Sequence, residues 1–184
     1  MESSSVADDY VIRPAHPRDA KALVALAEEI AAEPPGWLIS DGHWRTVADE
    51  RRYLRAVRRY RDAAVFVAET KHGIVGRLSL GRDPHPASRH VADLGLMVAI
   101  AWRRRGIGRA LLAQAVEWAR EVGVRKLELH VFPHNEPAIA LYEGFGFRRE
   151  GYRKEHYRRG REFVDAILMA YDVEQGVVAP RTTI

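Results

Sequence analysis

The sequence lacks cysteine at all of its 184 positions. This absence excludes a disulfide framework, a thiolate nucleophile and a sulfur-ligated metal within the chain. Long apolar runs are also lacking, because no stretch approaches the roughly 20 residues that span a membrane. Residues 1–9 are polar and acidic and do not resemble a leader segment. We therefore expect a cytoplasmic protein with no membrane contact.

A large excess of charge of one sign is missing too. Lys and Arg number 29 against 25 for Asp and Glu, which leaves a formal net charge of +4. This excess is too small to predict binding to nucleic acid. Nearly all the basic residues are arginines, which favour a small ligand that bears phosphate.

With 47% apolar residues, the chain has the size and composition of one α/β domain. It contains no internal repeat and no linker-like segment. We expect tails at residues 1–9 and 173–184 around a single domain at 10–172. Helical spacing of apolar residues predicts helices at 18–33, 46–61, 110–122 and 138–145. β-branched or alternating runs predict strands at 10–13, 63–70, 74–81, 92–98, 126–132, 147–157 and 162–171.

The stretch 92–122 organises the chain, because an apolar strand is followed by a basic turn with two glycines and then by an amphipathic helix. Peptide N–H groups at a helix start have no intrahelical partner and lie at the positive end of the helix dipole, so they favour phosphate oxygens. Gly106 and Gly108 carry no Cβ and are expected to let a ligand approach the backbone. Taken alone, the segment is equally consistent with a tight turn and a solvated arginine run.

Two motifs together resemble the GNAT superfamily of acyl-CoA-dependent N-acyltransferases. The first is the Arg-x-x-Gly-x-Gly that begins at Arg103, and the second is Asn135-x-x-Ala138-x-x-Leu141-Tyr142-x-x-x-Gly146-Phe147. The resemblance spans roughly residues 11–171. It implies a single-domain α/β (α+β) fold with a mixed, mostly antiparallel twisted sheet of about seven strands and about four helices. A V-shaped split is implied between the fourth and fifth strands, here 92–98 and 126–132.

The resemblance implies that acetyl-CoA binds in this split as co-substrate, without a metal. It assigns backbone contacts with the pantetheine arm to Leu96, Met97 and Val98. It assigns the pyrophosphate loop to Arg103, Arg104, Arg105, Gly106, Ile107, Gly108 and Arg109. Further cofactor-binding positions are Asn135, Ala138 and Tyr142. Ile100 stands where a proline is frequent and Arg104 where a glycine is common, but neither change removes a required N–H.

Tyr142 matches the tyrosine that serves as general acid near the thioester sulfur. A phenol with an ordinary pKa of about 10 can donate its proton to a leaving thiolate whose conjugate acid has a pKa of about 8.5. Asn135 is also suited to cap the helix that follows it. The alternative for Tyr142 is a core tyrosine with a satisfied hydroxyl.

The attacking amine must lose a proton, so a base is expected. Asp93 matches an acidic residue of phosphinothricin-acetyltransferase-like members. His130 stands where ribosomal-protein alanine N-acetyltransferases carry a glutamate, and an imidazole titrates near neutral pH. We favour Asp93 slightly, although each residue is equally explained as an ordinary strand side chain.

The final hairpin, 147–171, is similar to the ending of family members that acetylate free amino acids and other small amines. We therefore hypothesise transfer of an acetyl group from acetyl-CoA to a primary amine of a small molecule or amino acid, by direct attack through a tetrahedral intermediate. Two alternatives stay open: a ribosomal-protein-like N-terminal acetyltransferase, and a catalytically idle acyl-CoA-binding sensor module. The expected partners are acetyl-CoA and a small amine acceptor, and homodimer formation stays open.

Overall fold

The structure of the protein, a computed structural model, describes residues 10–34, 36–39 and 45–174. Its helices are α1 (Ala20–Ala31), α2 (Val47–Val57), α3 (Ile107–Val122) and α4 (Glu136–Phe145). Its strands are β1 (Tyr10–Pro14), β2 (Ala63–Thr70), β3 (Gly73–Arg82), β4 (Val91–Val98), β5 (Lys126–Val131), β6 (Arg148–Arg159) and β7 (Glu162–Asp172). The proposed tail at 1–9 and residues 175–184 of the other tail lie outside the described residues.

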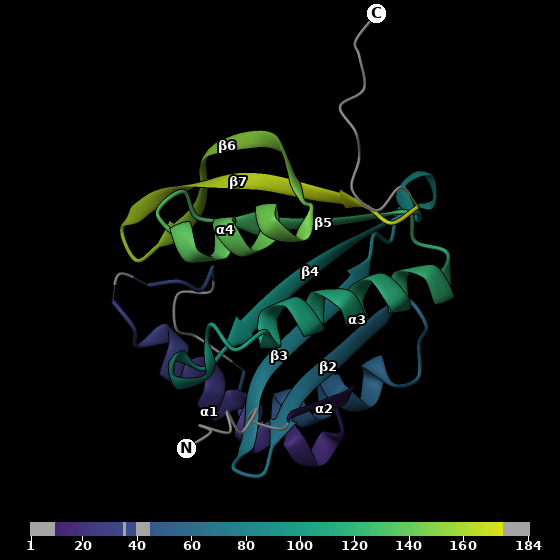
Figure 1. Ribbon diagram of the computed structural model, residues 1–184, viewed down its shortest axis with the longest axis vertical. Helices are drawn as coiled ribbons and strands as arrows, with labels where there is room; N and C mark the ends of the chain where they lie inside the picture. The colour runs from purple at the N-terminus through teal and green to yellow at the C-terminus, as the bar shows by residue number, and fades with distance from the viewer. Residues whose placement is uncertain (1–9, 35, 40–44, 175–184) are drawn as a thin grey trace, which may run out of the picture.

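One seven-stranded sheet joins all the strands in the order β1-β2-β3-β4-β5-β7-β6. Every neighbouring pair is antiparallel except β4 and β5, which run parallel. In the described part of the chain these two strands pair only from Val91↔Lys126 to Asp93↔Glu128. Beyond Asp93 they diverge, and the two halves of the sheet separate (Figure 1). The predicted mixed sheet and its split are confirmed.

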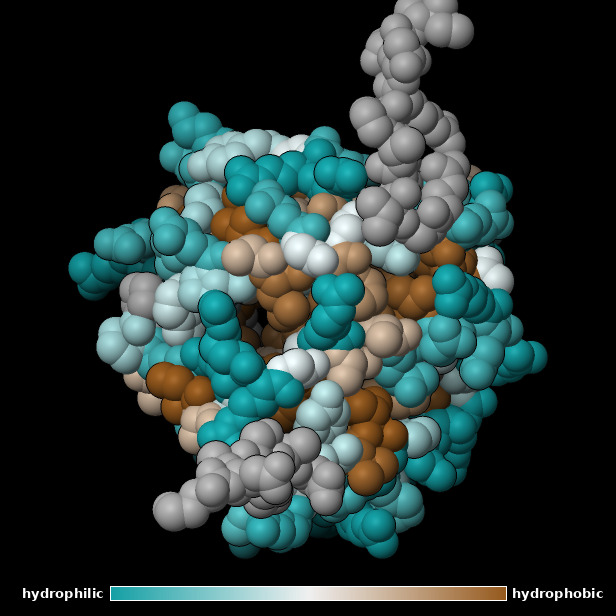
Figure 2. Space-filling model, in the orientation of Figure 1, coloured by the Kyte–Doolittle hydropathy of each residue, from teal (hydrophilic) through white to brown (hydrophobic). Residues whose placement is uncertain are grey.

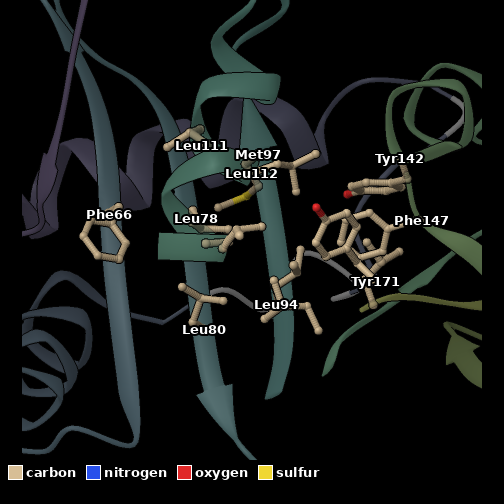
Figure 3. Packing of buried hydrophobic residues seen from close by; sticks show 14 of the residues in the cluster. Phe66, Leu78, Leu80, Leu94, Met97, Leu111, Leu112, Tyr142, Phe147 and Tyr171 are labelled. Atoms are coloured by element: carbon tan, nitrogen blue, oxygen red, sulfur yellow. The ribbon is translucent and has the colours of Figure 1, made fainter. Parts of the chain in front are cut away.

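The larger half of the sheet, β1 to β4, has a hydrophobic core on each face, because side chains alternate strictly along β2. Val65 and Val67 pack with apolar residues of α1 and α2, whereas Phe66 and Ala68 join the core that contains α3. Gly76 on β3 permits close packing there, because a Cβ would lie 3.1 Å from a methyl of Leu111. Figure 3 shows the packed side chains of the second core. The two cores hold β4 in a fixed position on one side of the split.

The smaller half of the sheet, β5 to β6, carries α4, and a cluster of aromatic rings packs this helix against the strands. Phe147 lies with its ring centroid 5.7 Å from that of Tyr142 and 5.4 Å from that of Tyr171, in the tilted geometry that aromatic pairs favour. The predicted helix ends are also confirmed: Gly123 ends α3 at φ +76°, and Gly146 ends α4 at φ +123°. This half therefore places α4 opposite the start of α3.

None of the helices in the described ranges is long and apolar enough to cross a lipid bilayer. The same residues hold no group of three or more His, Asp or Glu side chains arranged to bind a metal ion.

Candidate active site

The split opens into a cavity of about 680 Å³. Its walls come from β4 and the start of α3 on one side, from β5 and α4 on the other, and from Trp37, Leu38 and Ile39, which follow α1. Figure 2 shows a hollow bordered by hydrophobic residues, with hydrophilic side chains at its rim, where Figure 1 places α4 opposite the N-terminal end of α3. Most of the residues named from the sequence as cofactor contacts lie on these walls.

The free edge of β4 forms one wall. Leu96, Met97 and Val98 line the cavity, and in the described part of the chain they have no strand partner on the β5 side. The Val98 carbonyl accepts a hydrogen bond from Arg103 Nε at 2.9 Å. Backbone groups at such an unpaired edge can bind an extended ligand as an added strand would.

The loop before α3 has an unusual backbone conformation. Arg104 and Gly106 both have positive φ, +63° and +83°. The Ala110 N–H bonds to the Gly106 carbonyl at 3.0 Å, so the three preceding N–H groups have no acceptor within the helix. The Ile107 side chain is buried in the core and anchors the helix start. The peptide N–H groups at this helix start therefore form the part of the cavity best suited to phosphate.

Gly108 lines the cavity, and it also lies where α3 packs against α4. A Cβ at Gly108 would lie 2.8 Å from Leu141 Cδ2, so the leucine side chain would have to shift. At Gly106, by contrast, a Cβ would approach only the Tyr10 hydroxyl, at 3.7 Å, and it is the positive φ that favours glycine. The two glycines thus serve different purposes.

Arg103 is occupied by protein contacts. Its Nη1 and Nη2 donate to the two carboxylate oxygens of Glu33, just beyond α1, at 2.8 and 2.7 Å. With its bond to Val98, this guanidinium ties the end of α1 to the end of β4. Arg103 lines the cavity, but its guanidinium is used to position the loop. Arg104 also lines the cavity, and its side chain is exposed. Arg109 also lines it and donates to the Gly144 carbonyl at 3.1 Å.

Arg105 does not line the cavity, and its guanidinium lies over the Trp102 ring, 4.9 Å from the centroid.

On the opposite wall, Asn135 caps α4 as predicted, because its Oδ1 accepts from the Ala138 N–H at 3.3 Å. Asn135 and Ala138 both line the cavity. Since the cap uses the amide oxygen, the amide NH₂ of Asn135 keeps its donors for a ligand.

Tyr142 lines the cavity from α4 and is only 7% exposed. In Figure 3 its ring lies beside Phe147 and its hydroxyl points away from α4 towards the side on which Met97 lies. Burial raises the pKa of this phenol well above its usual range. Tyr142 therefore keeps its proton across neutral pH, and burial also makes it a weaker proton donor to a thiolate than the ordinary phenol assumed from the sequence.

His130 lines the cavity from β5, and its Nδ1 lies 2.6 Å from the Tyr157 hydroxyl on β6. Its Nε2 is buried and has no hydrogen-bond partner among the residues that the structure describes. Burial is the main cause that lowers the pKa of His130, with Arg153 and His156 acting in the same direction and Glu128 opposing them. The imidazole is therefore neutral at pH 7.

Asp93 lies at the last position where β4 pairs with β5 and is not part of the cavity wall. Loss of hydration, followed by the carboxylates of Glu128 and Asp83, raises its pKa. Since Asp93 pairs with Glu128 and side chains alternate along β5, Asp93 and His130 project from the same face of the sheet. The structure thus brings both proposed bases to one face but only His130 into the cavity.

Several cavity residues were not identified from the sequence. Among them are Ser79 on β3, Phe132 after β5, and Trp37, Leu38 and Ile39. The sequence around Trp37, Leu38 and Ile39 shows no periodicity, so nothing local indicates that these three residues line the cavity. Ser79 stands opposite Gly95 in the β3–β4 register, and that register can be seen only once the strands are paired.

Comparisons with known proteins agree with this geometry. Residues 23–147 match the model of the Acetyltransferase (GNAT) family. The chain is 32% identical over 173 residues to the L-amino acid N-acetyltransferase AaaT of Escherichia coli K12, covering 88% of this chain and 97% of AaaT. It superimposes on the ribosomal-protein-alanine N-acetyltransferase of Brucella melitensis with a TM-score of 0.77 at 29% identity, over 88% of this chain and 99% of that one. It also shares its fold with Salmonella typhimurium yncA, solved with its cofactor acetyl-CoA, with a TM-score of 0.80 at 18% identity over 95% and 99% of the two chains.

Proposed function

Because the chain belongs to the GNAT acetyltransferase family, we propose that it transfers the acetyl group of acetyl-CoA to the primary amine of a free amino acid or a similarly small amine. The observation that carries this proposal is the cavity itself. It joins a phosphate-binding helix start, an unpaired strand edge, a buried phenol and a neutral imidazole in one space. The similarity to AaaT, which spans nearly all of that enzyme, supports a small acceptor.

The residues of the cavity fit acetyl-CoA. The N–H groups at the start of α3, with Arg104, would hold the pyrophosphate, and the free edge of β4 would hold the pantetheine arm. Asn135 would donate to the same arm with its amide NH₂. When bound, acetyl-CoA supplies an activated acetyl thioester. The chain's own residues then bind and orient the two substrates and move the protons.

His130 is the base that we propose in preference to Asp93, because it lies on the cavity wall and is neutral at pH 7. It accepts a proton from the acceptor's ammonium, which frees the nitrogen lone pair for attack. Tyr142 donates its hydroxyl proton to the departing sulfur. The nitrogen loses a second proton as the tetrahedral intermediate collapses to the amide, and that proton replaces the one that Tyr142 gave to the sulfur. The ammonium and acetyl-CoA thus yield the amide, the CoA thiol and one proton, which leaves His130 for solvent.

Thiol release from acetyl-CoA, measured across amino acids, polyamines, aminoglycosides and short peptides, tests the proposal. We expect turnover with one or more free amino acids. Tight binding of acetyl-CoA without turnover on any acceptor would instead support a sensor module.

A second candidate function is acetylation of a protein N-terminus. The similarity to the Brucella ribosomal-protein-alanine N-acetyltransferase over 88% of this chain favours it. A peptide that begins with alanine, compared with free alanine at equal concentration, separates the two. A kcat/KM that is higher for the peptide would favour the second function.

A further inference from the structure

Ser79 on β3 lines the cavity, and the direction of its one hydrogen bond is fixed by chemistry. Its Oγ lies 2.9 Å from Arg77 Nε. An arginine can only donate, so the serine oxygen must be the acceptor. Ser79 makes no other side-chain hydrogen bond within the described residues. Its hydroxyl proton is therefore available to an acceptor group in the cavity.

The arginine behind Ser79 is held in place from α2. Arg77 Nη1 lies 2.9 Å from Glu50 Oε1, and both side chains are almost completely buried. The carboxylate compensates the guanidinium charge, and the pair fixes the position of Nε. The Ser79 hydroxyl is therefore a neutral donor that is held in position at the cavity. The positive charge of Arg77 next to it is already compensated by Glu50.

Open space lies directly beside this hydroxyl. Ser79 is paired with Gly95 of β4, so the two positions share one face of the sheet. A Cβ at Gly95 would meet no heavy atom within 4 Å. Trp37 and Leu38 line the same cavity. There is thus room for a small ligand group over Gly95, next to the Ser79 donor.

We infer that the Ser79 hydroxyl donates a hydrogen bond to an oxygen of the acceptor. This oxygen belongs to the carboxylate or carbonyl group attached to the carbon that bears the amine. This inference rests on the proposed function, because it requires the amine to react at the split. Neighbouring strands lie about 4.8 Å apart, so Ser79 stands one strand away from the free edge of β4. That spacing suits an amine at the split and an oxygen a few bonds away on the same molecule.

The two sources of such an oxygen are a free α-amino acid and the first residue of a peptide. In both, a group with a C=O bond is attached to the carbon that bears the amine. A simple amine of the same side chain, such as 2-phenylethylamine, lacks this group. The discriminating set is therefore L-phenylalanine, 2-phenylethylamine and a dipeptide that begins with phenylalanine. The ratio of kcat/KM for an oxygen-bearing acceptor to kcat/KM for 2-phenylethylamine measures recognition of the oxygen.

Ser79→Ala should lower this ratio about tenfold relative to wild type, as expected for one hydrogen bond to a charged or polar group. Ser79→Thr keeps the hydroxyl and should preserve the ratio. Ser88→Ala, in the 3₁₀ turn Pro86–Ser88 and not on the cavity wall, serves as the matched control. A fall in the ratio with phenylalanine alone identifies the carboxylate as the group bound, and a fall with the dipeptide alone identifies the peptide carbonyl.

The readout separates failure of this inference from failure of the proposed function. If wild type acetylates no acceptor of the full panel named under the proposed function, that function is wrong, and the inference fails with it; if it acetylates another free amino acid but not phenylalanine, the three-member set is rebuilt on that amino acid. If wild type is active and Ser79→Ala leaves the ratio unchanged, only the inference is overturned. An equal loss with every acceptor also overturns it, because that result means that Ser79 merely holds Arg77 in place.

Discussion

The two walls of the cavity are built in different ways. The wall made by β4 and the start of α3 is one continuous segment, and it presents backbone groups whose positions depend on unusual φ angles at Arg104 and Gly106. The wall on the acceptor side presents side chains from distant segments, among them Ser79, His130 and Trp37. A continuous backbone segment suits a ligand part that stays the same, whereas separate side chains can change one at a time with the acceptor.

The two walls also predict different consequences of mutation. Changes on the side-chain wall and at Tyr142 remove a chemical group and should reduce the rate. Changes on the backbone wall alter conformation and should reduce affinity for acetyl-CoA or the free energy of unfolding. The experiments below test this division.

The largest effect is expected for Tyr142→Phe. The ring and its packing on Phe147 remain, but the proton donor is lost, so kcat should fall by about 10²- to 10⁴-fold. Calorimetry should find the dissociation constant of acetyl-CoA nearly unchanged. A variant with wild-type kcat would mean that Tyr142 is only a core residue.

The next effect separates His130 from Asp93. If His130 is the base, kcat should rise with pH through an apparent pKa on the acid side of its ordinary value of about 6.5, because burial favours the neutral ring. His130→Ala should lower kcat by about 10²-fold and remove this rise of kcat with pH, which is the acidic limb of the pH profile. Asp93→Asn should keep the limb, since Asp93 lies outside the cavity wall.

The charged and titratable groups that affect the His130 ring are Arg153, His156 and Glu128, and the Tyr157 hydroxyl bonds to it. Arg153→Ala removes a cation that lowers the pKa of His130, so the limb should move to higher pH. The folded ring binds fewer protons than the unfolded one between their two pKa values, so stability from this group increases as pH rises through that window. Loss of the limb in Asp93→Asn, with the limb kept in His130→Ala, would reverse the assignment.

The backbone wall was largely predictable from the sequence because its signals are local. An apolar strand, two glycines and a helical period lie within 31 consecutive residues (92–122), and the Asn135 cap and the stop at Gly123 follow equally local rules. The packing contact between Gly108 and Leu141 could not be found in this way, because Leu141 lies in another helix.

Apart from His130, which the sequence named as a candidate base, the acceptor wall was not predictable, for a related reason. Tyr157 reaches His130 across β7 only after a register shift between Arg153 and Tyr157 in β6, where Glu155 has φ +51°. Simple alternation along a strand fails at such a bulge. Ser79 depends in turn on pairing with Gly95, which is a contact between strands.

A smaller effect should distinguish the two glycines of the loop. An alanine at Gly106 would have to hold φ near +83°, which costs about 1–2 kcal/mol, so the loop should relax and weaken acetyl-CoA binding about tenfold. Gly108→Ala should instead lower the melting temperature by crowding Leu141, and Gly108→Ala/Leu141→Ala should recover part of that loss. If Gly108→Ala weakens binding without a change in melting temperature, the ligand approaches at Gly108 after all.

The smallest effect is expected at the Arg103–Glu33 pair, which ties α1 to the end of β4. The pair is bidentate and partly exposed, so a double-mutant cycle of Arg103→Met and Glu33→Gln should give a coupling energy of about 1 kcal/mol in the free energy of unfolding. Acetyl-CoA affinity should change only a few-fold, because the guanidinium acts through the loop. The more exposed Arg120–Glu117 pair on α3 is the matched control and should show weaker coupling. A large loss of affinity in Arg103→Met, with Glu33→Gln unaffected, would show instead that Arg103 leaves Glu33 to bind phosphate.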